Sequence, residues 1–333
     1  MRVAVLGGGR SSEHDVSLGS AASVREGLES AGHEVIAVEL ARDGTWSADG
    51  TQALLQAGRG LLGADVVFPV LHGPYGEDGT IQGLLEILDV PYVGSGVAAS
   101  AICIDKIIFK QFMAQAGLPQ VAFAAVDVDR WAADRAAVER EVAALGLPVF
   151  VKPARLGSSV GITRVSSADE LSAAIEEAHR FDPRAIVEAA APGLEIECSV
   201  LGHAASPEVS DPGEIRILAS ASPGGWYDYE AKYTQGGMEL IVPAQITAAA
   251  RERVMKLAAE AFRAAGCSGL ARADFFVDGE EVLLNELNTM PGFTATSVYG
   301  HLWERSGLAY PQLVDRLVTL AIERHVAERA HRY

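Results

Sequence analysis

The chain has 333 residues, of which 49% are hydrophobic and 21% charged, and its formal net charge is −17. This length is enough for two or three domains with substantial cores. The acidic balance argues against nucleic acid as a partner, because such binding needs a basic surface. A few lysines and arginines inside a cleft can still bind a nucleotide.

The cysteines and the apolar runs indicate a cytoplasmic protein. Cys103, Cys198 and Cys267 are widely separated and form no CxxC pair, which is typical of reduced thiols. The run Val3 to Leu6 is too short for a signal peptide. No stretch approaches the ~20 apolar residues that a membrane span needs. We therefore expect no membrane partner.

The N-terminal third alternates strands with helices. Strands are expected at 2–6, 34–40 and 64–70, and helices at 13–31 and from about 78. Such alternation predicts an α/β fold whose parallel sheet is covered on both faces.

The rest of the chain continues with both kinds of element and changes towards strict strand alternation after residue 188. Helices are expected at 106–116, 134–145, 247–265 and 310–328, and strands at 121–126, 148–153, 186–188, 195–201 and 214–220. The Gly-, Tyr- and Ser-rich segment 222–238 is expected to be a long loop, and such loops often cover binding sites. We place domains at 1–95, 96–188 and 189–333.

Two late strands carry the most informative side chains. Arg272 and Asp274 share one face of the first, and Glu286 and Asn288 share one face of the second. If these strands are neighbours, their oxygen ligands converge, and such ligands suit Mg²⁺, which usually arrives with nucleotide phosphates. The apolar run 282–284 marks the second strand as buried, and a buried carboxylate needs a partner or a metal. The sequence therefore predicts metal binding by Asp274, Glu286 and Asn288.

A glycine loop follows Lys152 at the end of a strand. Gly157 and Gly161 flank hydroxyl residues there, and glycines let successive backbone N–H groups approach a phosphate. The spacing is not that of a P-loop, and an ordinary hairpin turn would explain the loop in isolation. The presence of Lys106, Lys152 and the metal cluster in one chain favours phosphate binding.

Two polar turns in the first third have two interpretations each. The segment Ser11 to Ser17 places polar groups at a helix N-terminus, where anions or amines bind, but Ser11 or Ser12 can equally cap that helix. His72 lies beside a glycine just beyond the strand ending at Val70, at the edge where α/β sheets bind ligands. A lone histidine is also often structural, so both interpretations stay open.

Six blocks of the sequence together resemble the D-alanine–D-alanine ligases of the ATP-grasp superfamily. These blocks are Gly7–Glu13, His72–Gly79, Lys152–Gly161, Tyr227–Tyr233, Arg272–Asp274 and Asn285–Gly292. They follow the family order and the match extends to about Tyr299. The resemblance implies an ATP-grasp fold of three α/β domains, with a parallel-sheet N-terminal domain and ATP between the central and C-terminal domains.

The same resemblance implies the cofactors and their contacts. ATP and two Mg²⁺ ions are expected, with Mn²⁺ as a substitute and a monovalent cation as a further option. The residues implied in nucleotide binding are Lys106, Lys152, Glu188, Ala191, Glu195, Lys232 and Phe276. The adenine segment departs from the family pattern, because small residues follow Glu188 where larger ones are common. Backbone hydrogen bonds to adenine would survive that change.

The resemblance further implies that two D-alanine molecules are joined through an acyl phosphate, with release of ADP and phosphate, for peptidoglycan precursor synthesis. The residues implied in catalysis are Glu13, Ser158, Tyr233, Arg272, Gly292 and Ser297. The residues implied in substrate binding are Glu13, His72, Arg272, Gly292, Ser297 and Val298. A homodimer is also expected.

Three other functions compete with this one. A D-alanine–D-lactate ligase would share the metal cluster, but Tyr233 at the end of Glu-Ala-Lys-Tyr favours an amine nucleophile. A dinucleotide-dependent dehydrogenase is disfavoured because the turn at Gly7–Gly9 lacks GxGxxG spacing. A non-catalytic nucleotide sensor would not need Arg272 together with the complete metal set.

Overall fold

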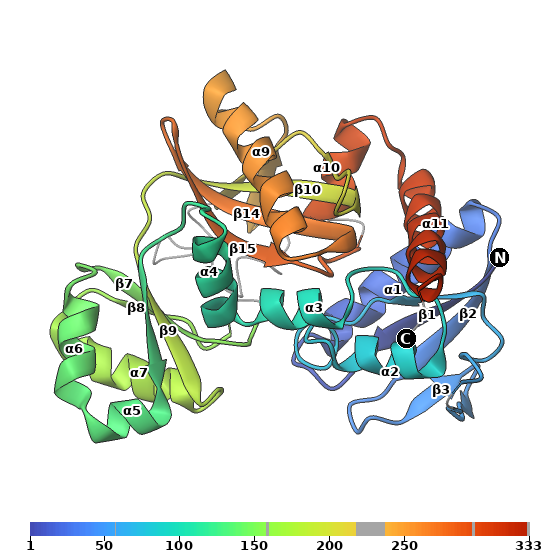
Figure 1. The fold of residues 1–333 in the computed structure, drawn as a ribbon, viewed down its shortest axis with the longest axis horizontal. Coiled ribbons are helices and arrows are strands. Elements are labelled where there is room, and N and C mark those ends of the chain that lie inside the picture. The colour runs from blue at the N-terminus through green and yellow to red at the C-terminus, as the bar shows by residue number, and fades with distance from the viewer. Residues whose placement is uncertain (57, 158–159, 218–236, 295–296, 332–333) are drawn as a thin grey trace.

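The computed structural model describes residues 1–56, 58–157, 160–217, 237–294 and 297–331. These residues form three β-sheets, which lie one after another across the molecule, and helices pack against each of them (Figure 1). The fold is therefore mixed α/β, as the sequence predicts.

The first sheet contains the parallel strands expected of the N-terminal third. Its strands are β1 (Arg2–Gly8), β2 (Glu34–Leu40), β3 (Trp46–Ala48), β4 (Thr51–Gln52) and β5 (Val66–Pro69). The order is β4-β3-β2-β1-β5, in which β1 pairs in parallel with β2 and β5 while β3 and β4 add an antiparallel edge. The helices of this part are α1 (His14–Ser30) and α2 (Thr80–Leu88).

The last helix of the chain returns to this first sheet. Helix α11 (Tyr310–Arg329) lies beside α1, as the red and blue ribbons of Figure 1 show. Leu313 and Leu317 share a buried core with Val3, Leu28 and Phe68. Residues from both ends of the chain therefore form one core.

The second sheet is antiparallel, and two helices connect it to the first. The connecting helices are α3 (Val97–Ile104) and α4 (Lys106–Gln115). The strands are β6 (Phe123–Asp127), β7 (Val149–Pro153), β8 (Thr163–Val165) and β9 (Arg184–Ala189), in the order β6-β9-β7-β8. The helices that follow α4 are α5 (Val128–Ala133), α6 (Arg135–Ala143), a 3₁₀ turn (Ala168–Glu170) and α7 (Leu171–His179).

The third sheet is also antiparallel, and it carries the two late strands. Its strands are β10 (Leu194–His203), β11 (Glu208–Val209), β12 (Gly213–Ile217), β13 (Met238–Ile241), β14 (Ser268–Asp278) and β15 (Glu281–Asn288). The order is β13-β12-β10-β14-β15, with β11 on β10. Helix α9 (Ala248–Ala264) packs on this sheet, and α10 (Val298–Arg305) follows β15. Met238 begins a strand, although the sequence placed it in the long loop.

Two further properties concern the helices and the cysteines. In the part of the chain that the structure describes, no helix combines the length and the apolar character of a membrane span. The three cysteines are buried and form no disulfide. Burial raises the pKa of the Cys198 thiol to about 12, which makes this group a poor nucleophile.

Candidate active site

The two late strands are neighbours, as the predicted metal cluster requires. In the antiparallel β14–β15 pair, Arg272 lies opposite Asn288 and Asp274 opposite Glu286. Residues directly opposite each other in an antiparallel pair share a face of the sheet, so these four side chains converge. Glu197 of β10 lies opposite Asp274 on the other side and joins the same face.

Arg272 is the centre of this cluster. Its Nε and Nη2 donate to the two carboxylate oxygens of Asp274 at 2.8 and 2.7 Å, and Nε lies 2.9 Å from Glu197 Oε2. Burial disfavours the charged guanidinium, but attraction from Asp274 and Glu197 outweighs it and raises the pKa of Arg272 well above its usual value. The guanidinium is therefore charged and held in one orientation.

The oxygen donors of the cluster suit a divalent cation. Asn288 donates through Nδ2 to Asp274 Oδ2 at 3.1 Å, which leaves its amide oxygen as a ligand. The side chains of Asp274 and Glu286 are partly buried, at 13% and 26% exposure. Two carboxylates and one amide oxygen form a hard donor set of the kind that Mg²⁺ uses. Metal binding by these residues stays a prediction.

Glu188 and two lysines form a second charged group. Its carboxylate oxygens lie 2.5 Å from Lys152 Nζ and 2.9 Å from Lys110 Nζ. Burial disfavours the carboxylate charge, but the two lysines outweigh it and hold the pKa of Glu188 well below its usual range. Burial also opposes the charge of Lys152, and attraction from Glu188 raises the pKa of that lysine. Ion pairs with Glu188 therefore hold Lys110 and Lys152 in largely buried positions.

Lys106 lies between the glycine-loop segment and the oxygen cluster. It begins helix α4, where the Asp105 side chain caps the helix by accepting a hydrogen bond from Ile108 N at 3.1 Å. Its Nζ donates to Leu156 O at 2.7 Å, in the glycine-loop segment, and lies 3.9 Å from Glu286 Oε2. One lysine thus approaches both the glycine loop and the predicted metal site.

Glu13 lies between the two glycine turns. A Cβ atom on Gly73 would stand 2.7 Å from Glu13 Oε2, and one on Gly157 would stand 3.1 Å from the same oxygen. The missing side chains of these two glycines leave room for the Glu13 carboxylate on both sides. The structure therefore brings the predicted amine-binding carboxylate to the glycine loop and to the turn after His72.

Other predicted residues lie on β10 and β14, at the start of α10 and after β9. Those that pair across strands are Glu195 of β10 and Phe276 of β14. Those at the start of α10 are Ser297, which precedes the helix, and Val298, its first residue. Ala191 follows β9. Three predicted residues, Ser158, Lys232 and Tyr233, lie outside the described residues, so the predicted lid stays a prediction.

Sequence reasoning missed two residues of these clusters. Lys110 lies four residues after Lys106, and this spacing places both on one face of α4. Glu197 lies two residues after Glu195, and this spacing places both on one face of β10. The helical spacing of Lys106 and Lys110 and the strand spacing of Glu195 and Glu197 could therefore have identified Lys110 and Glu197 from the sequence.

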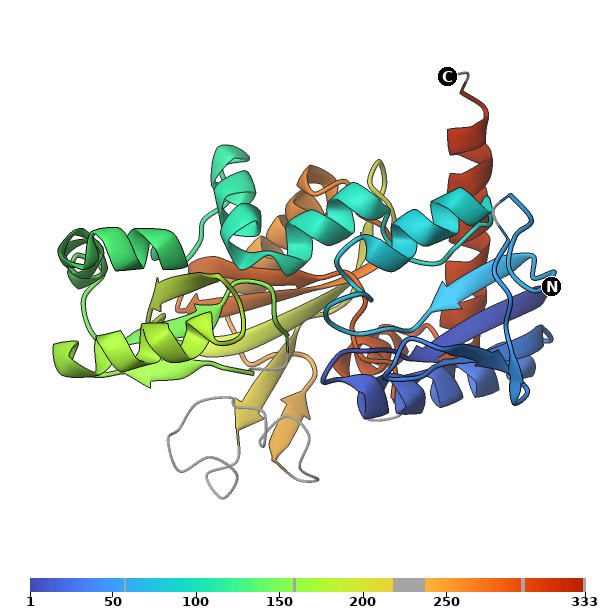
Figure 2. The same cartoon turned by 90° about the horizontal axis from the view of Figure 1, so that it is seen from below.

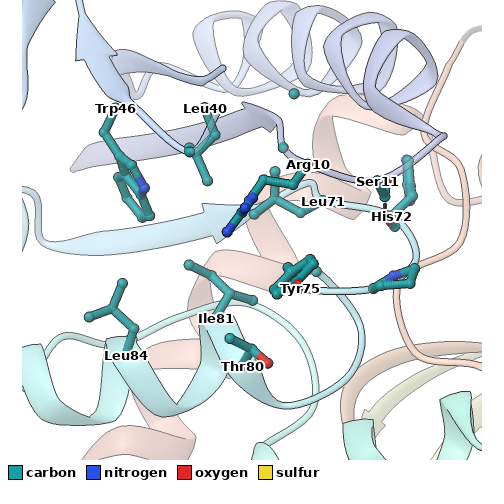
Figure 3. A pocket seen from close by; sticks show the side chains of 15 residues that line it. Arg10, Ser11, Leu40, Trp46, Leu71, His72, Tyr75, Thr80, Ile81 and Leu84 are labelled. Carbon is teal, nitrogen blue, oxygen red and sulfur yellow. Dashed lines mark hydrogen bonds between the residues drawn. The ribbon is translucent and has the colours of Figure 1, made fainter. Parts of the chain in front are cut away.

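A cavity of about 230 Å³ adjoins the first sheet near His72 (Figure 3). Its walls are mainly apolar, and they include Leu40, Trp46 and Ile81. Arg10 also lines the cavity, and its guanidinium carbon lies 5.2 Å from the centre of the Tyr75 ring. None of the predicted metal ligands lines it, so this cavity is separate from the charged clusters.

The two antiparallel sheets, with Lys152 on one, the oxygen cluster on the other and Lys106 and Lys110 on helix α4, define an ATP-grasp enzyme. Family models described as "D-ala D-ala ligase C-terminus" and "D-ala D-ala ligase N-terminus" match residues 112–319 and residues 2–61 and 51–95. The chain belongs to the D-alanine–D-alanine ligase family.

Similar proteins agree over nearly the whole chain. A D-alanine–D-alanine ligase of Deinococcus radiodurans is 46% identical, covering 97% of this chain and 98% of its own. A D-alanine–D-alanine ligase of Mycobacterium ulcerans is 44% identical, and the match covers 99% of this chain and 97% of the relative.

Two solved structures have the same fold. The D-alanine–D-alanine ligase of Coxiella burnetii has a TM-score of 0.87 at 33% identity, covering 99% of this chain and 96% of its own. The D-Ala:D-Ser ligase of Enterococcus faecalis has a TM-score of 0.84 at 34% identity, and the match covers 96% of this chain and 99% of that ligase. Both similarities extend over at least 96% of this chain.

Proposed function

We propose that this protein joins two D-alanine molecules into D-alanyl-D-alanine at the expense of ATP, releasing ADP and phosphate. The product would serve peptidoglycan precursor synthesis. The observation that carries the proposal is that Arg272, Asp274, Glu286 and Asn288 lie on one face of the β14–β15 pair. Lys106 lies near Glu286 of this face and also donates a hydrogen bond to the glycine-loop segment. Family membership and the relatives' names support it.

In the first half of the reaction, the carboxylate of the first D-alanine attacks the γ-phosphate of ATP and forms an acyl phosphate. Lys106 and Lys152 offset phosphate charge, and Glu188 keeps Lys152 in place through their ion pair. Asp274, Glu286 and Asn288 would hold magnesium, which would supply further charge neutralisation. We propose two such ions, with Mn²⁺ as a substitute and a monovalent cation as an additional ligand.

Glu13 binds the ammonium of the first D-alanine in this proposal. Its side chain is 7% exposed and lies against Gly73 and Gly157, so the substrate is enclosed between two turns. Enclosure matters because an acyl phosphate hydrolyses readily in water. Ser158, Lys232 and Tyr233 are proposed to complete the enclosure.

In the second half, the amine of the second D-alanine attacks the acyl carbon and phosphate leaves. Arg272 and the Gly292 N–H stabilise the tetrahedral oxyanion, and one such donor is often worth ~3–4 kcal/mol. Asp274 and Glu197 orient the Arg272 guanidinium for this role. Ser297 and Val298 contact the second amino acid.

The test is an assay of the purified protein with ATP, Mg²⁺ and D-alanine. We expect phosphate and D-alanyl-D-alanine in equal amounts. Parallel reactions with D-serine or D-lactate beside D-alanine separate the neighbouring specificities, and we expect the amide of D-alanine to dominate at neutral pH. ATP use without D-alanine, or AMP as a product, would reject the proposal. Depsipeptide as the main product would reject the amine assignment.

We also propose that the protein acts in the cytoplasm as a homodimer. ATP as a substrate and buried cysteines without disulfides suit the cytoplasm. Helices α2, α3 and α4 follow one another along one side of the molecule (Figure 2). Large apolar side chains on each of these helices are exposed. These are Ile87 at 66% exposure, Val97 at 42% and Phe112 at 40%. Sedimentation of wild type and Phe112→Glu tests the dimer, which the variant should weaken.

A further inference from the structure

The turn Met290–Phe293, which carries Gly292, is held by side chains from the N-terminal third of the chain. Met290 N donates to Glu77 Oε2 at 3.3 Å, and Met290 O lies 3.0 Å from His72 Nδ1. Phe293 N donates to Ser20 Oγ at 3.2 Å. The backbone groups on both sides of Gly292 are therefore anchored by a different part of the fold.

The directions of these hydrogen bonds form one consistent chain. A carbonyl oxygen can only accept, so His72 Nδ1 carries the proton and donates to Met290 O. The neutral ring then accepts at Nε2, and Ser20 Oγ, 3.1 Å away, donates to it. Ser20 Oγ is left to accept from Phe293 N. Burial lowers the pKa of His72, which agrees with the neutral ring that this chain requires.

Glu77 ties the His72 loop to the same turn. Its Oε1 accepts from Gly73 N at 2.8 Å, while its Oε2 accepts from Met290 N. The two oxygens therefore bridge segments more than two hundred residues apart in the sequence. Ser11 Oγ donates to His72 O at 2.7 Å and fixes the other side of that loop.

The turn has little freedom to move against these anchors. A Cβ atom on Gly292 would stand 2.8 Å from Ser297 Oγ, so the turn is tightly packed on its far side. The Phe293 ring packs edge-on against Phe68, with centroids 5.7 Å apart, and Tyr310 donates to Phe293 O at 3.2 Å. The direction of the Gly292 N–H thus depends on contacts made at Met290 and Phe293.

We propose that Ser20 and Glu77 are positioning residues for attack by the second D-alanine, because with His72 they hold the turn whose Gly292 N–H faces the developing oxyanion. The proposal rests on the proposed function. In this step the amine nitrogen forms the new C–N bond, the acyl C–O bond to phosphate breaks, phosphate leaves with the electron pair, and the nitrogen loses a proton that the departing phosphate takes up. Neither Ser20 nor Glu77 touches a reacting atom.

The two halves of the reaction provide the test. Positional isotope exchange in ATP carrying ¹⁸O at the β–γ bridge reports reversible acyl phosphate formation, which the proposal leaves to the lysines and the metal site. Dipeptide formation reports both halves. In Ser20→Ala and Glu77→Gln we expect dipeptide kcat to fall by about ten- to hundredfold, because small misplacements of a catalytic group cost that much. The rate of positional isotope exchange in ATP, measured in the presence of D-alanine, should stay within about twofold of the wild-type rate.

Matched controls lie on the same helix as Ser20. Ser23→Ala removes a hydroxyl that bonds only to Gly19 O in the described structure, and Glu26→Gln neutralises an exposed carboxylate. Both should keep dipeptide formation near the wild-type rate. Thermal unfolding of every variant checks that the fold persists.

Three results would overturn the inference. If positional isotope exchange and dipeptide formation fell by the same factor in these variants, Ser20 and Glu77 would act before the second D-alanine reacts. Unchanged dipeptide formation in both variants would show that the anchors do not matter to catalysis. Loss of cooperative unfolding in both variants would show a structural role alone. Failure of the wild type to form dipeptide is a separate outcome, which rejects the proposed function itself.

Discussion

At the scale of single residues, the charged side chains of the site are held by one another. Glu188 has each carboxylate oxygen beside a lysine, and Arg272 lies between two carboxylates. A buried ion left without its partner is strongly destabilising, so these pairs keep cations in place where phosphate charge would arrive. Removing one member should therefore affect ligand binding and charge balance together.

Lys152→Ala tests this at the nucleotide side. We expect the KM for ATP to rise at least tenfold, equivalent to about 1.4 kcal/mol, because one cation that we propose to contact the phosphates is lost. Glu188 keeps its contact with Lys110, so the melting temperature should fall by only a few degrees. Steady-state kinetics and calorimetry measure both. Lys256→Ala, on an exposed lysine, is the control, and near-normal kinetics in Lys152→Ala would remove this lysine from the site.

Glu77 should make stability depend on pH. Burial and the nearby charge of Glu13 raise the pKa of Glu77 to about 8 from a usual value of 4.5. A raised carboxyl pKa favours the protonated folded state, so its contribution is full below about pH 4.5 and is lost as the pH rises through about 8. The unfolding free energy of wild type relative to Glu77→Gln should decline across that window. Denaturant unfolding at several pH values measures it, and a difference that does not change with pH would contradict the assignment.

At the scale of secondary structure, helix α4 positions two of the lysines. Asp105 caps its first turn and also forms an ion pair with Arg184 of β9. Lys106 and Lys110 lie one turn apart on this helix and reach different charged partners, Glu286 and Glu188. The start of α4 thus fixes where cations meet both sheets.

Asp105→Ala should therefore act on both stability and ATP binding. Loss of a capping side chain usually costs ~1 kcal/mol, and the partly buried Arg184 would also lose its partner. We expect the unfolding free energy to fall by about 1–3 kcal/mol and the KM for ATP to rise. Asp134→Ala removes the analogous cap of α6, which carries no predicted site residue, so it should change stability alone. Equal KM changes in the two variants would refute the positional role of Asp105.

The secondary structure predicted from the sequence was most accurate where the periodicity is strong and local. Strand β2 has the predicted bounds, and α4 differs from prediction at its last residue only. Helices α3, α5 and α10 and the β3–β4 hairpin were missed because they are short. Short elements contain too few repeats of a pattern, and tertiary packing stabilises them instead.

At the scale of the whole molecule, the C-terminal helix belongs to the core of the N-terminal sheet. Leu313, Val314 and Leu317 of α11 pack with residues of β1, α1 and β5. The turn that carries Gly292 lies close to this core, since Phe293 is part of it. Substitutions on the buried face of α11 should therefore disturb the position of Gly292, the proposed oxyanion donor, through these packing contacts.

Leu317→Ala is the corresponding prediction. The side chain is fully buried, and such truncations typically cost ~2–5 kcal/mol. We expect a lower melting temperature and faster hydrogen exchange in β1, although Leu317 lies more than three hundred residues away. Thr319→Ala, at an exposed position of the same helix, should leave both unchanged. Exchange in β1 at the wild-type rate despite lost stability would show that the two segments unfold independently.

The sequence by itself determined which side chains share a face of the two late strands, because strand alternation is a local property. Arg272, Asp274, Glu286 and Asn288 were predicted to share a face, and the β14–β15 register places them there. Only the tertiary structure decided which residues hold the site in position. Ser20 and Glu77 reach a turn more than two hundred residues away, and no local period encodes such a contact. Long-range hydrogen bonds arise from how the sheets pack.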